Sequence, residues 1–361
     1  MHFIRSKGEL TMNTSSRDWR CAFLVLILAG GLGVLAGPAA AQPFGAWLTL
    51  SGADSTYISV PHSASLNPTD GFTFEAWVSV TDSGACSSIA GKNYLQAWWI
   101  GVCGTTLRSY LQGGGSSHDG GTVPAGKWTH IAVTWDGATR RHYINGELAA
   151  SFPQATPPTT STAALRIAGD VSWQYAPAGA IDEVRLWNLA RTTQQLRDAI
   201  NEPILADTTG LVATWGLNAN ANDVTGAHNG SGVGSPGYLT FPVAPFCVPS
   251  AHSLCLADRF AVSVEWRNYS AVTGVGTTAP CGTDESGLFW FFNSQNWELL
   301  AKVVDGCGLN NRWWFYSAAT TDVFYRLEVF DIVGGANKIY FNYLGDPAKA
   351  NNDSDAFATC P

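Results

Sequence analysis

Carboxylate pairs and histidines decide first whether this sequence could carry catalysis. Hydrolysis of a glycosidic bond needs two carboxyl groups that face each other across that bond. Asp182 and Glu183 are adjacent, so on a strand their side chains point to opposite faces. The sequence contains no H-E-x-x-H and no G-x-S-x-G motif, and its 7 histidines are scattered singly. We therefore assign no catalytic residue and expect that the protein is not an enzyme.

Glu75 and His130 are the other pair whose side chains could interact chemically. In the alternating segment 72–78, Glu75 shares a face with Thr73 and Trp77, opposite the apolar residues. This face would be the outer, often concave, face of a sheet. His130 falls on the same face of a neighbouring strand, so we expect a hydrogen bond to Glu75 with a structural role. Contact with a ligand is the alternative.

Several aromatic and charged residues in or near loops have the chemistry to bind a saccharide. Aromatic rings can stack on the faces of a sugar, and polar side chains can bind its hydroxyl groups. Each of these residues could instead pack in the core or in a turn. The candidate ligand-binding residues are Trp98, Arg108, His118, Asp119, Trp173 and Tyr175.

The N-terminal segment has the features of an export signal. Two arginines precede an uncharged apolar run at 22–37, and the small residues at 39–41 fit an A-x-A cleavage site. Residues 1–41 are therefore predicted to be a signal peptide, and the mature chain should begin at Gln42. A membrane anchor is the alternative, but the apolar run is short for a bilayer span. We expect a secreted, extracellular protein with no membrane span after cleavage.

Export changes how the cysteines are interpreted. Of the 8 cysteines, Cys21 would leave with the signal peptide, and an oxidising compartment favours disulfides among the rest. Cys86 and Cys103 lie on either side of a predicted strand and should be bridged to each other. In the C-terminal part we expect bridges Cys307–Cys360 and Cys247–Cys255, with Cys281 unpaired.

The composition excludes some partners and favours one fold class. The chain has 361 residues, a formal net charge of −8 and only 13% charged residues. No basic patch is present, so we expect no nucleic acid partner. With 38 glycines and 15 tryptophans, the sequence is typical of an all-β protein with many tight turns. Its length suggests two domains.

The stretch 178–191 organises the first domain. Apolar and polar side chains alternate at 184–187, which predicts a half-buried strand. Thr192 and Gln195 then have the spacing of a capping box, which predicts that a short helix begins there.

The sequence around this stretch predicts strands joined by tight turns. Asp136-Gly137 and Asn145-Gly146 favour hairpin turns, and the glycine-rich segment 113–121 is predicted to be a loop tip. The predicted strands are 47–50, 56–60, 72–78, 94–102, 128–135, 164–168, 210–216 and 238–241.

Four of these stretches together resemble a known domain. In chain order they are FTFEAWV (72–78), WTHIAVTWDG (128–137), YING (143–146) and GAIDEVRLWNLART (179–192). They are similar to the LamG-like jelly roll of the concanavalin A-like lectin/glucanase superfamily, over about residues 43–243. The resemblance implies a two-sheet jelly-roll sandwich. The E-x-D-x-x-E pattern of the superfamily's β-glucanases is absent, so the resemblance implies no hydrolase activity.

The resemblance also implies a structural calcium ion. LamG-like and pentraxin-like domains often hold one with Asp or Asn side chains and backbone carbonyls, the hard oxygen ligands that calcium prefers. The candidate metal ligands are Asp54, Asp170 and Asp182. Ordinary turn and cap carboxylates are the alternative.

The C-terminal part, residues 247–361, follows a linker rich in Gly, Ser and Pro. Its pattern predicts a second, smaller, disulfide-bearing β-sandwich, which resembles no family that we can name. The predicted strands are 260–266, 288–292, 299–304, 312–316, 323–330 and 338–343.

The sequence as a whole predicts a secreted, non-enzymatic binding protein. Its LamG-like domain would recognise carbohydrate or an extracellular protein surface. Two alternatives remain at this point: a structural or adhesive protein that binds no sugar, and an accessory to a polysaccharide hydrolase.

Overall fold

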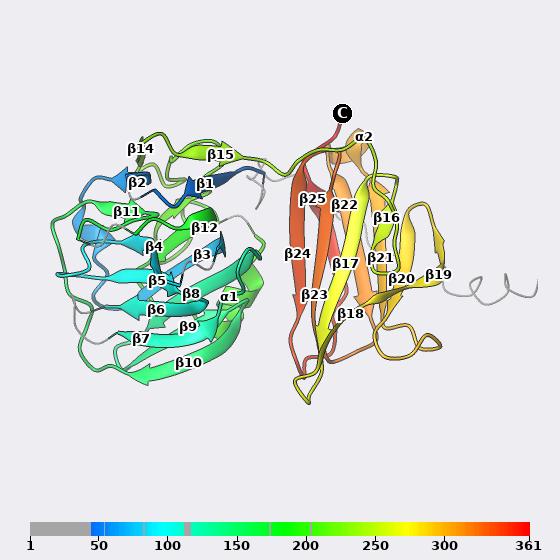
Figure 1. The fold of residues 1–361 in the computed structure, drawn as a ribbon, viewed down its shortest axis with the longest axis horizontal. Helices are drawn as coiled ribbons and strands as arrows, with labels where there is room; N and C mark the ends of the chain where they lie inside the picture. The colour runs from blue at the N-terminus through cyan, green and yellow to red at the C-terminus, as the bar shows by residue number, and fades with distance from the viewer. Residues whose placement is uncertain (1–44, 54, 82–83, 112–116, 173–174, 203) are drawn as a thin grey trace, which may run out of the picture.

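Two β-sandwiches lie side by side in the computed structural model (Figure 1). The structure describes residues 45–361 except 54, 82–83, 112–116, 173–174 and 203. The predicted signal peptide, Asp54 and Trp173 therefore lie outside the described residues. Within the described part of the chain, no helix is long and apolar enough to cross a membrane.

The first sandwich is made of two antiparallel sheets, A and B. The strands of sheet A are β1 (Trp47–Ser51), β3 (Phe72–Val80), β8 (Thr129–Trp135), β9 (Thr139–Ile144), β10 (Glu147–Pro153), β12 (Ala178–Trp187), β13 (Leu211–Trp215) and β15 (Gly237–Leu239). Those of sheet B are β2 (Tyr57–Val60), β4 (Cys86–Gly91), β5 (Trp99–Cys103), β6 (Thr106–Tyr110), β7 (His118–Thr122), β11 (Leu165–Ile167) and β14 (Ser231–Val233). A 3-10 turn at Ala64–Leu66 follows β2.

The strand order is that of a jelly roll, in which neighbours in space are distant in sequence. Sheet A runs β10-β9-β8-β3-β12-β1-β15, with β13 paired to β12. Sheet B runs β14-β2-β11-β4-β5-β6-β7. Strand β12, which contains most of the stretch 178–191, therefore lies between β3 and β1, so that early and late parts of the domain are neighbours in sheet A.

Strand β3 shows why the alternation in the sequence produces two layers. Phe72, Phe74 and Val78 point between the sheets and are at most 1% exposed. Glu75 and Trp77 point to the opposite, outer face of sheet A, as predicted. Each large apolar side chain buried in this way contributes about 2 kcal/mol to stability.

Helix α1 (Thr193–Ala199) begins where the sequence predicts. The Gln195 amide donates to Thr192 Oγ1 at 3.2 Å, and the Thr192 amide donates to Gln195 Oε1 at 2.8 Å, which completes the capping box. Leu196 packs against Ala132 and Tyr143 on the outer face of sheet A. The helix therefore covers part of that face.

Two predicted boundaries in the first sandwich are wrong. The strand expected at 94–102 begins only at Trp99, because residues 93–97 turn through hydrogen bonds to the Asn93 carbonyl and Asn93 itself has φ of 84°. The loop tip expected at 113–121 contains the start of β7, since pairing with β6 outweighs the low strand propensity of its glycines.

The second sandwich is made of sheets C and D, also antiparallel. Sheet C contains β16 (Leu254–Leu256), β17 (Phe260–Arg267), β18 (Thr273–Val275), β23 (Phe324–Asp331) and β24 (Ala336–Asn342). Sheet D contains β19 (Thr277–Thr283), β20 (Ser286–Trp290), β21 (Leu299–Asp305), β22 (Trp313–Ala319) and β25 (Asn351–Phe357). Their orders are β16-β17-β23-β24, with β18 beside β17, and β19-β20-β21-β22-β25. A short helix α2 (Cys307–Asn310) follows β21.

The six strands predicted for this part are all present, but four more were missed. The missed strands are β16, β18, β19 and β25. Three of them lie at sheet edges and β18 pairs only with β17. Edge strands can carry polar or short sequences, as in the segment NNDSDAF of β25, and such segments lack the buried alternation that predicts a strand.

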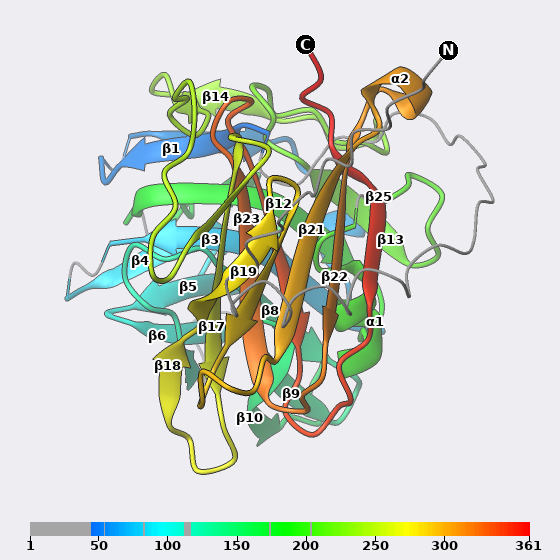
Figure 2. The ribbon, with the colours of Figure 1, turned by 90° about the vertical axis from the view of Figure 1, so that its right-hand side faces the viewer.

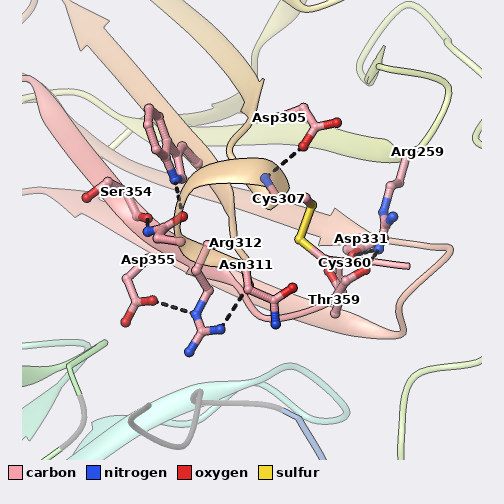
Figure 3. Close-up of a disulfide and its surroundings, with 12 residues drawn as sticks. Arg259, Asp305, Cys307, Asn311, Arg312, Asp331, Ser354, Asp355, Thr359 and Cys360 are labelled. Atoms are coloured by element: carbon pink, nitrogen blue, oxygen red, sulfur yellow. Dashed lines mark hydrogen bonds and ion pairs between the residues drawn. A yellow bond between two sulfur atoms is a disulfide. The ribbon is translucent and has the colours of Figure 1, made fainter. Parts of the chain in front are cut away.

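Three predicted disulfides are confirmed. Cys86 is bridged to Cys103, Cys247 to Cys255, and Cys307 to Cys360. The last bridge joins α2 to the C-terminal segment, beside the Arg259–Asp331 pair (Figure 3). The prediction that Cys281 is unpaired is wrong, because this residue is also disulfide-bonded.

Sheet C of the second sandwich faces the outer surface of sheet A. Figures 1 and 2 show that the strands of the two sandwiches cross at a steep angle. Trp77 stacks on Phe341 of β24 with ring centroids 6.3 Å apart, and Trp47 contacts Phe241, which contacts Phe330 of β23. The part of the outer face of sheet A around Trp47 and Trp77 is therefore covered by the second sandwich, although the sequence predicted only that it is an outer, often concave, face.

Candidate functional site

Trp98 is the predicted ligand-binding residue that the structure excludes. Its side chain is fully buried between sheets A and B and lies 5.5 Å from the ring of Phe72. Its indole N–H donates to the Leu66 carbonyl at 3.2 Å. The reason is the alternation at the start of β5, which points Trp98 inward and Trp99 outward.

Arg108 and Asp119 do come together on the outer face of sheet B. They are directly opposite each other on β6 and β7. Arg108 Nε lies 2.5 Å from Asp119 Oδ1, and Nη2 lies 2.7 Å from Oδ2, a two-bond contact between planar groups. The hydrogen bond from Arg108 lowers the pKa of Asp119, and this outweighs the effect of partial burial. The pair is half-exposed and fixed in one orientation.

An aromatic cluster that the sequence analysis missed lies beside this ion pair. Tyr110 is directly opposite Trp99 on β5, and Arg108 is opposite Gly101, so these side chains share one face. The Tyr110 ring lies 4.6 Å from Tyr94 and 5.8 Å from Trp99. The period-two spacing of Arg108 and Tyr110, and the position of Trp99 two residues before Gly101, were the signals that could have revealed it.

Local contacts hold these rings in place. The indole N–H of Trp99 donates to Ser88 Oγ at 2.8 Å. A Cβ at Gly101 would lie 2.2 Å from the Trp99 ring, so only glycine allows the indole to lie against the sheet there. A hydrogen bond with Tyr110, followed by burial, raises the pKa of Tyr94 to about 12. Trp99 is the buried floor, and the two tyrosines are half-buried walls.

Tyr175 is near the cluster, and His118 is directed elsewhere. The Tyr175 carbonyl accepts the Ser88 amide at 2.7 Å, and the Tyr175 side chain is 51% exposed. His118 is opposite Ser109 on β6, so it points to the other face of sheet B and stacks on Phe152 at 4.4 Å. We call the set Tyr94, Trp99, Arg108, Tyr110, Asp119 and Tyr175 the sheet-B surface.

The predicted proximity of Glu75 and His130 is confirmed. His130 Nε2 lies 3.2 Å from Glu75 Oε2, and both side chains are buried. Glu75 Oε1 accepts hydrogen bonds from Trp187 Nε1 and Arg191 Nη1, each at 2.7 Å. Burial raises the pKa of Glu75, but His130 and the charges of Arg185 and Arg191 outweigh it and lower the pKa to about 2. The network lies beneath α1 and has a structural role.

Asp182 and Glu183 are both buried on β12. Asp182 is opposite Trp77 at a bulge in the pairing with β3. Glu183 has φ of 48°, and its carboxylate lies 3.1 Å from Arg185 Nη2. The prediction that adjacency places them on opposite faces fails here, because the bulge breaks the alternation: Ile181 and Val184 on either side both point into the core.

Asp170 does not fit as a metal ligand. It is fully buried, and its carboxylate accepts the amides of Asn93 at 2.8 Å, Tyr94 at 2.9 Å and Ser172 at 2.8 Å. These bonds explain why residues 93–97 form a turn and leave little lone-pair capacity for a cation. Asp170 lies beside β4 of sheet B and Asp182 in β12 of sheet A, so the two are not brought together. Nowhere in the described ranges do three or more His, Cys, Asp or Glu side chains form a group that could hold a metal ion.

Comparison with known proteins bears on the first sandwich. Residues 51–197 match the family model Laminin_G_3, described as the concanavalin A-like lectin/glucanases superfamily. No curated protein matches the chain.

Three solved structures are among those with which the chain can be compared. A candidate carbohydrate-binding protein from Bacteroides ovatus is 20% identical, with a TM-score of 0.47; the match covers 55% of this chain and only 60% of that protein. The Ruminococcus gnavus IT-sialidase CBM40 bound to α2,3-sialyllactose is 14% identical, with 42% and 94% covered and a TM-score of 0.35. Domains LG4–5 of the mouse laminin α1 chain are 12% identical, with 91% of each covered and a TM-score of 0.34.

The family match and the two-sheet order of the strands agree with each other and with the four sequence stretches. The first sandwich of this chain, which contains residues 51–197, is a LamG-like jelly roll of the concanavalin A-like lectin/glucanase superfamily.

Proposed function

We propose that the protein is a secreted, non-enzymatic carbohydrate-binding protein and that its sugar site is the sheet-B surface. The half-buried rings of Tyr94 and Tyr110 would stack on the apolar face of a pyranose. Arg108 and Asp119 would bind its hydroxyl groups as donor and acceptor. Aromatic contact with a few fixed polar groups is the general design of small-ligand sites.

The observation that carries this proposal is the register of β5, β6 and β7. It places Trp99, Tyr110, Arg108 and Asp119 on one face of three adjacent strands. That face belongs to sheet B, on the side of the first sandwich away from the second one (Figure 1). The outer face of sheet A is occupied by α1 and sheet C, so the sheet-B surface is the accessible broad face of this domain.

The burial of the carboxylates supports recognition rather than hydrolysis. A glycosidase needs two carboxyl groups that reach a bound sugar from opposite sides. Glu75, Asp182 and Glu183 are at most 6% exposed. On the sheet-B surface, Asp119 is already paired with Arg108. Binding without turnover is therefore the function that we propose for this site.

The disulfides support an extracellular location. Three bridges join cysteines of the described ranges in both sandwiches, and Cys281 is disulfide-bonded as well; such bridges persist in oxidising compartments. N-terminal sequencing of secreted material tests this part of the proposal: a chain that begins near Gln42 supports it, and one that retains residues 1–41 contradicts it.

A glycan array on the mature protein tests sugar binding. We expect binding of at least one glycan class, with a loss of about tenfold or more in Tyr110→Ala and in Arg108→Ala. The matched control is Tyr269→Ala, which removes a tyrosine that is 63% exposed on the second sandwich. Equal loss in the control, or no binding by folded protein to any glycan, would contradict the proposal and favour the adhesive alternative. Turnover of a polysaccharide would contradict the non-enzymatic part.

A further inference from the structure

A cavity of about 410 Å³ lies where the end of α1 meets the second sandwich. One wall is formed by residues 197–202 of the first sandwich. The other is formed by β24 and by residues 350–355 at the start of β25. Pockets that bind small molecules commonly have volumes of about 300–1,000 Å³ and often lie between domains, so a monosaccharide or disaccharide would fit.

The positive charges near this cavity are already engaged. Arg197 pairs with Asp346 at 3.2 Å, and its guanidinium lies 3.7 Å from the centre of the Tyr343 ring. Lys338 binds Asp353 at 2.6 Å. Figure 3 shows Asp355 held by Arg312, at 2.5 Å.

Glu202 remains as a carboxylate with no ion pair to any residue that the structure describes. It lines the cavity, and Asp198 lies one helical turn before it. Burial raises the pKa of Glu202; the charges of Lys338 and Arg185 lower it, and those of Asp353 and Asp355 raise it, with an upward shift as the result. The cavity therefore carries a net negative charge, because the arginines and the lysine beside it already have acidic partners. This charge favours a positively charged occupant.

One polar side chain on each wall also keeps an oxygen without a hydrogen-bond partner among the described residues. Asn201 is 9% exposed and Tyr343 is 8% exposed, and both line the cavity. Within the described part of the chain, Asn201 Oδ1 accepts no hydrogen bond, and the Tyr343 hydroxyl neither donates nor accepts one. A buried polar atom left in this state costs about 1–3 kcal/mol. Both oxygens are almost fully buried, so a ligand hydroxyl would reach either one only after its side chain turns towards the cavity.

We propose that this cavity binds a small polyhydroxylated ligand that carries a protonated primary amine, with Glu202 as its ion-pair partner. The hydroxyl groups of the ligand would contact the side chains of Asn201 and Tyr343. The inference goes beyond the proposed function, because the cavity lies between the two sandwiches and the sheet-B surface lies on the far side of the first one. An amino sugar has the chemistry that the cavity selects.

Calorimetric titration of the full mature chain with D-glucosamine tests the inference, in a Tyr110→Ala background that removes the sheet-B surface. D-glucose and N-acetyl-D-glucosamine are the neutral comparisons. We expect that D-glucosamine alone binds and that its affinity falls at higher ionic strength. Equal affinity for all three sugars, or no binding of D-glucosamine, would overturn the inference and would leave the sheet-B proposal untouched.

A matched pair of variants locates the site. Glu202→Gln should lower the affinity for D-glucosamine by about tenfold or more, because a charge-assisted contact is lost. Glu285→Gln changes an exposed carboxylate of the β19–β20 turn, at a distance from the cavity, and should leave the affinity unchanged. An unchanged affinity in Glu202→Gln, with both variants folded by circular dichroism, would show that the amine is not bound here.

Discussion

At the scale of single residues, Glu75 explains why a carboxylate can be buried at the centre of this molecule. Its two oxygens contact Trp187, Arg191 and His130. A buried charge is tolerated only when it is paired and hydrogen-bonded, and these groups come from two other parts of the chain, β8 and the segment that contains Trp187 and Arg191. The residue therefore ties β3 to β8 and to the segment that leads into α1.

The pH dependence of stability should report on Glu75. Its pKa in the folded state is about 2, below the ordinary 4.5, so the unfolded state binds more protons between these values. The contribution to the free energy of unfolding, about 3 kcal/mol, should be complete above pH 4.5 and should be lost as the pH falls towards 2. Urea titrations at pH 7, 4.5 and 3 measure it.

Glu75→Gln is the matching variant. At pH 7 it should lower the free energy of unfolding by about 3 kcal/mol, because the charges of Arg191 and Arg185 lose their partner. The part of the acid dependence that belongs to Glu75 should then disappear. A variant with wild-type stability at pH 7 would show that the network does not act as a charged cluster.

Calcium binding remains a prediction at the residue scale. Asp170 is committed to backbone amides, so Asp54 and Asp182 are the candidates that are left. If an ion binds only the folded protein, a hundredfold excess over Kd should add about 2.7 kcal/mol to stability. The measurement is the melting temperature in millimolar calcium and in chelator. A calcium response that persists in Asp182→Ala would place the ion elsewhere, and no response in the wild type would contradict binding.

At the scale of elements, α1 is the piece that closes the outer face of sheet A over Glu75. It has only seven residues, too few to be stable alone. The capping box fixes the start of the helix, and the buried side chain of Leu196 fixes the face that it turns towards sheet A. Arg185 fixes its end, because Arg185 Nη1 donates to the Ala199 carbonyl at 2.9 Å. Helix and network therefore depend on each other.

Removing the cap should loosen this element. Thr192→Ala deletes the acceptor for the Gln195 amide and should cost about 1 kcal/mol of unfolding free energy. Thr192→Ser keeps an acceptor oxygen and is the control, with a loss well below that of the alanine variant. Thermal denaturation compares the three proteins. Equal losses in both variants would mean that the methyl group of Thr192, and not the cap, matters.

At the scale of the whole molecule, the two sandwiches share a mixed interface. Trp47, Trp77 and Trp128 of the first form an apolar cluster with Ile339 and Phe341 of the second. Ion pairs surround it, including Arg267 with Glu147 at 2.8 Å and Lys127 with Glu265. Buried apolar area of this kind resists opening, so we expect the two sandwiches to unfold together.

Phe341→Ala tests this coupling in the full chain. Loss of the stack on Trp77 should lower the unfolding free energy by about 2 kcal/mol, and the calorimetric trace should separate into two transitions as the sandwiches uncouple. Phe246→Ala, which removes a ring that is 59% exposed, should have little effect. Two well-separated transitions in the wild type would contradict the coupling.

Much of the first sandwich follows from the sequence alone. Period-two alternation in 72–78 and 128–135, the Asp-Gly and Asn-Gly turns and the Thr192 capping box are local signals, and the observed elements obey them. The Cys86–Cys103 bridge follows from the strand between the two cysteines. Glu75 and His130 were placed together because strand alternation assigns side chains to faces regardless of the rest of the fold.

Tertiary structure decided the location of the sites. Trp98 and Trp99 are identical in type and adjacent, and only the phase of β5 in the sheet decides which ring points between the sheets and which points to the outer face of sheet B. The sheet-B surface exists because β5, β6 and β7 are in one register, and register depends on partners distant along the chain. The outer face of sheet A is covered by residues beyond 240. In the sequence, this face has the alternation of a strand with one side open to solvent, and only the packing of the second sandwich decides that it is buried.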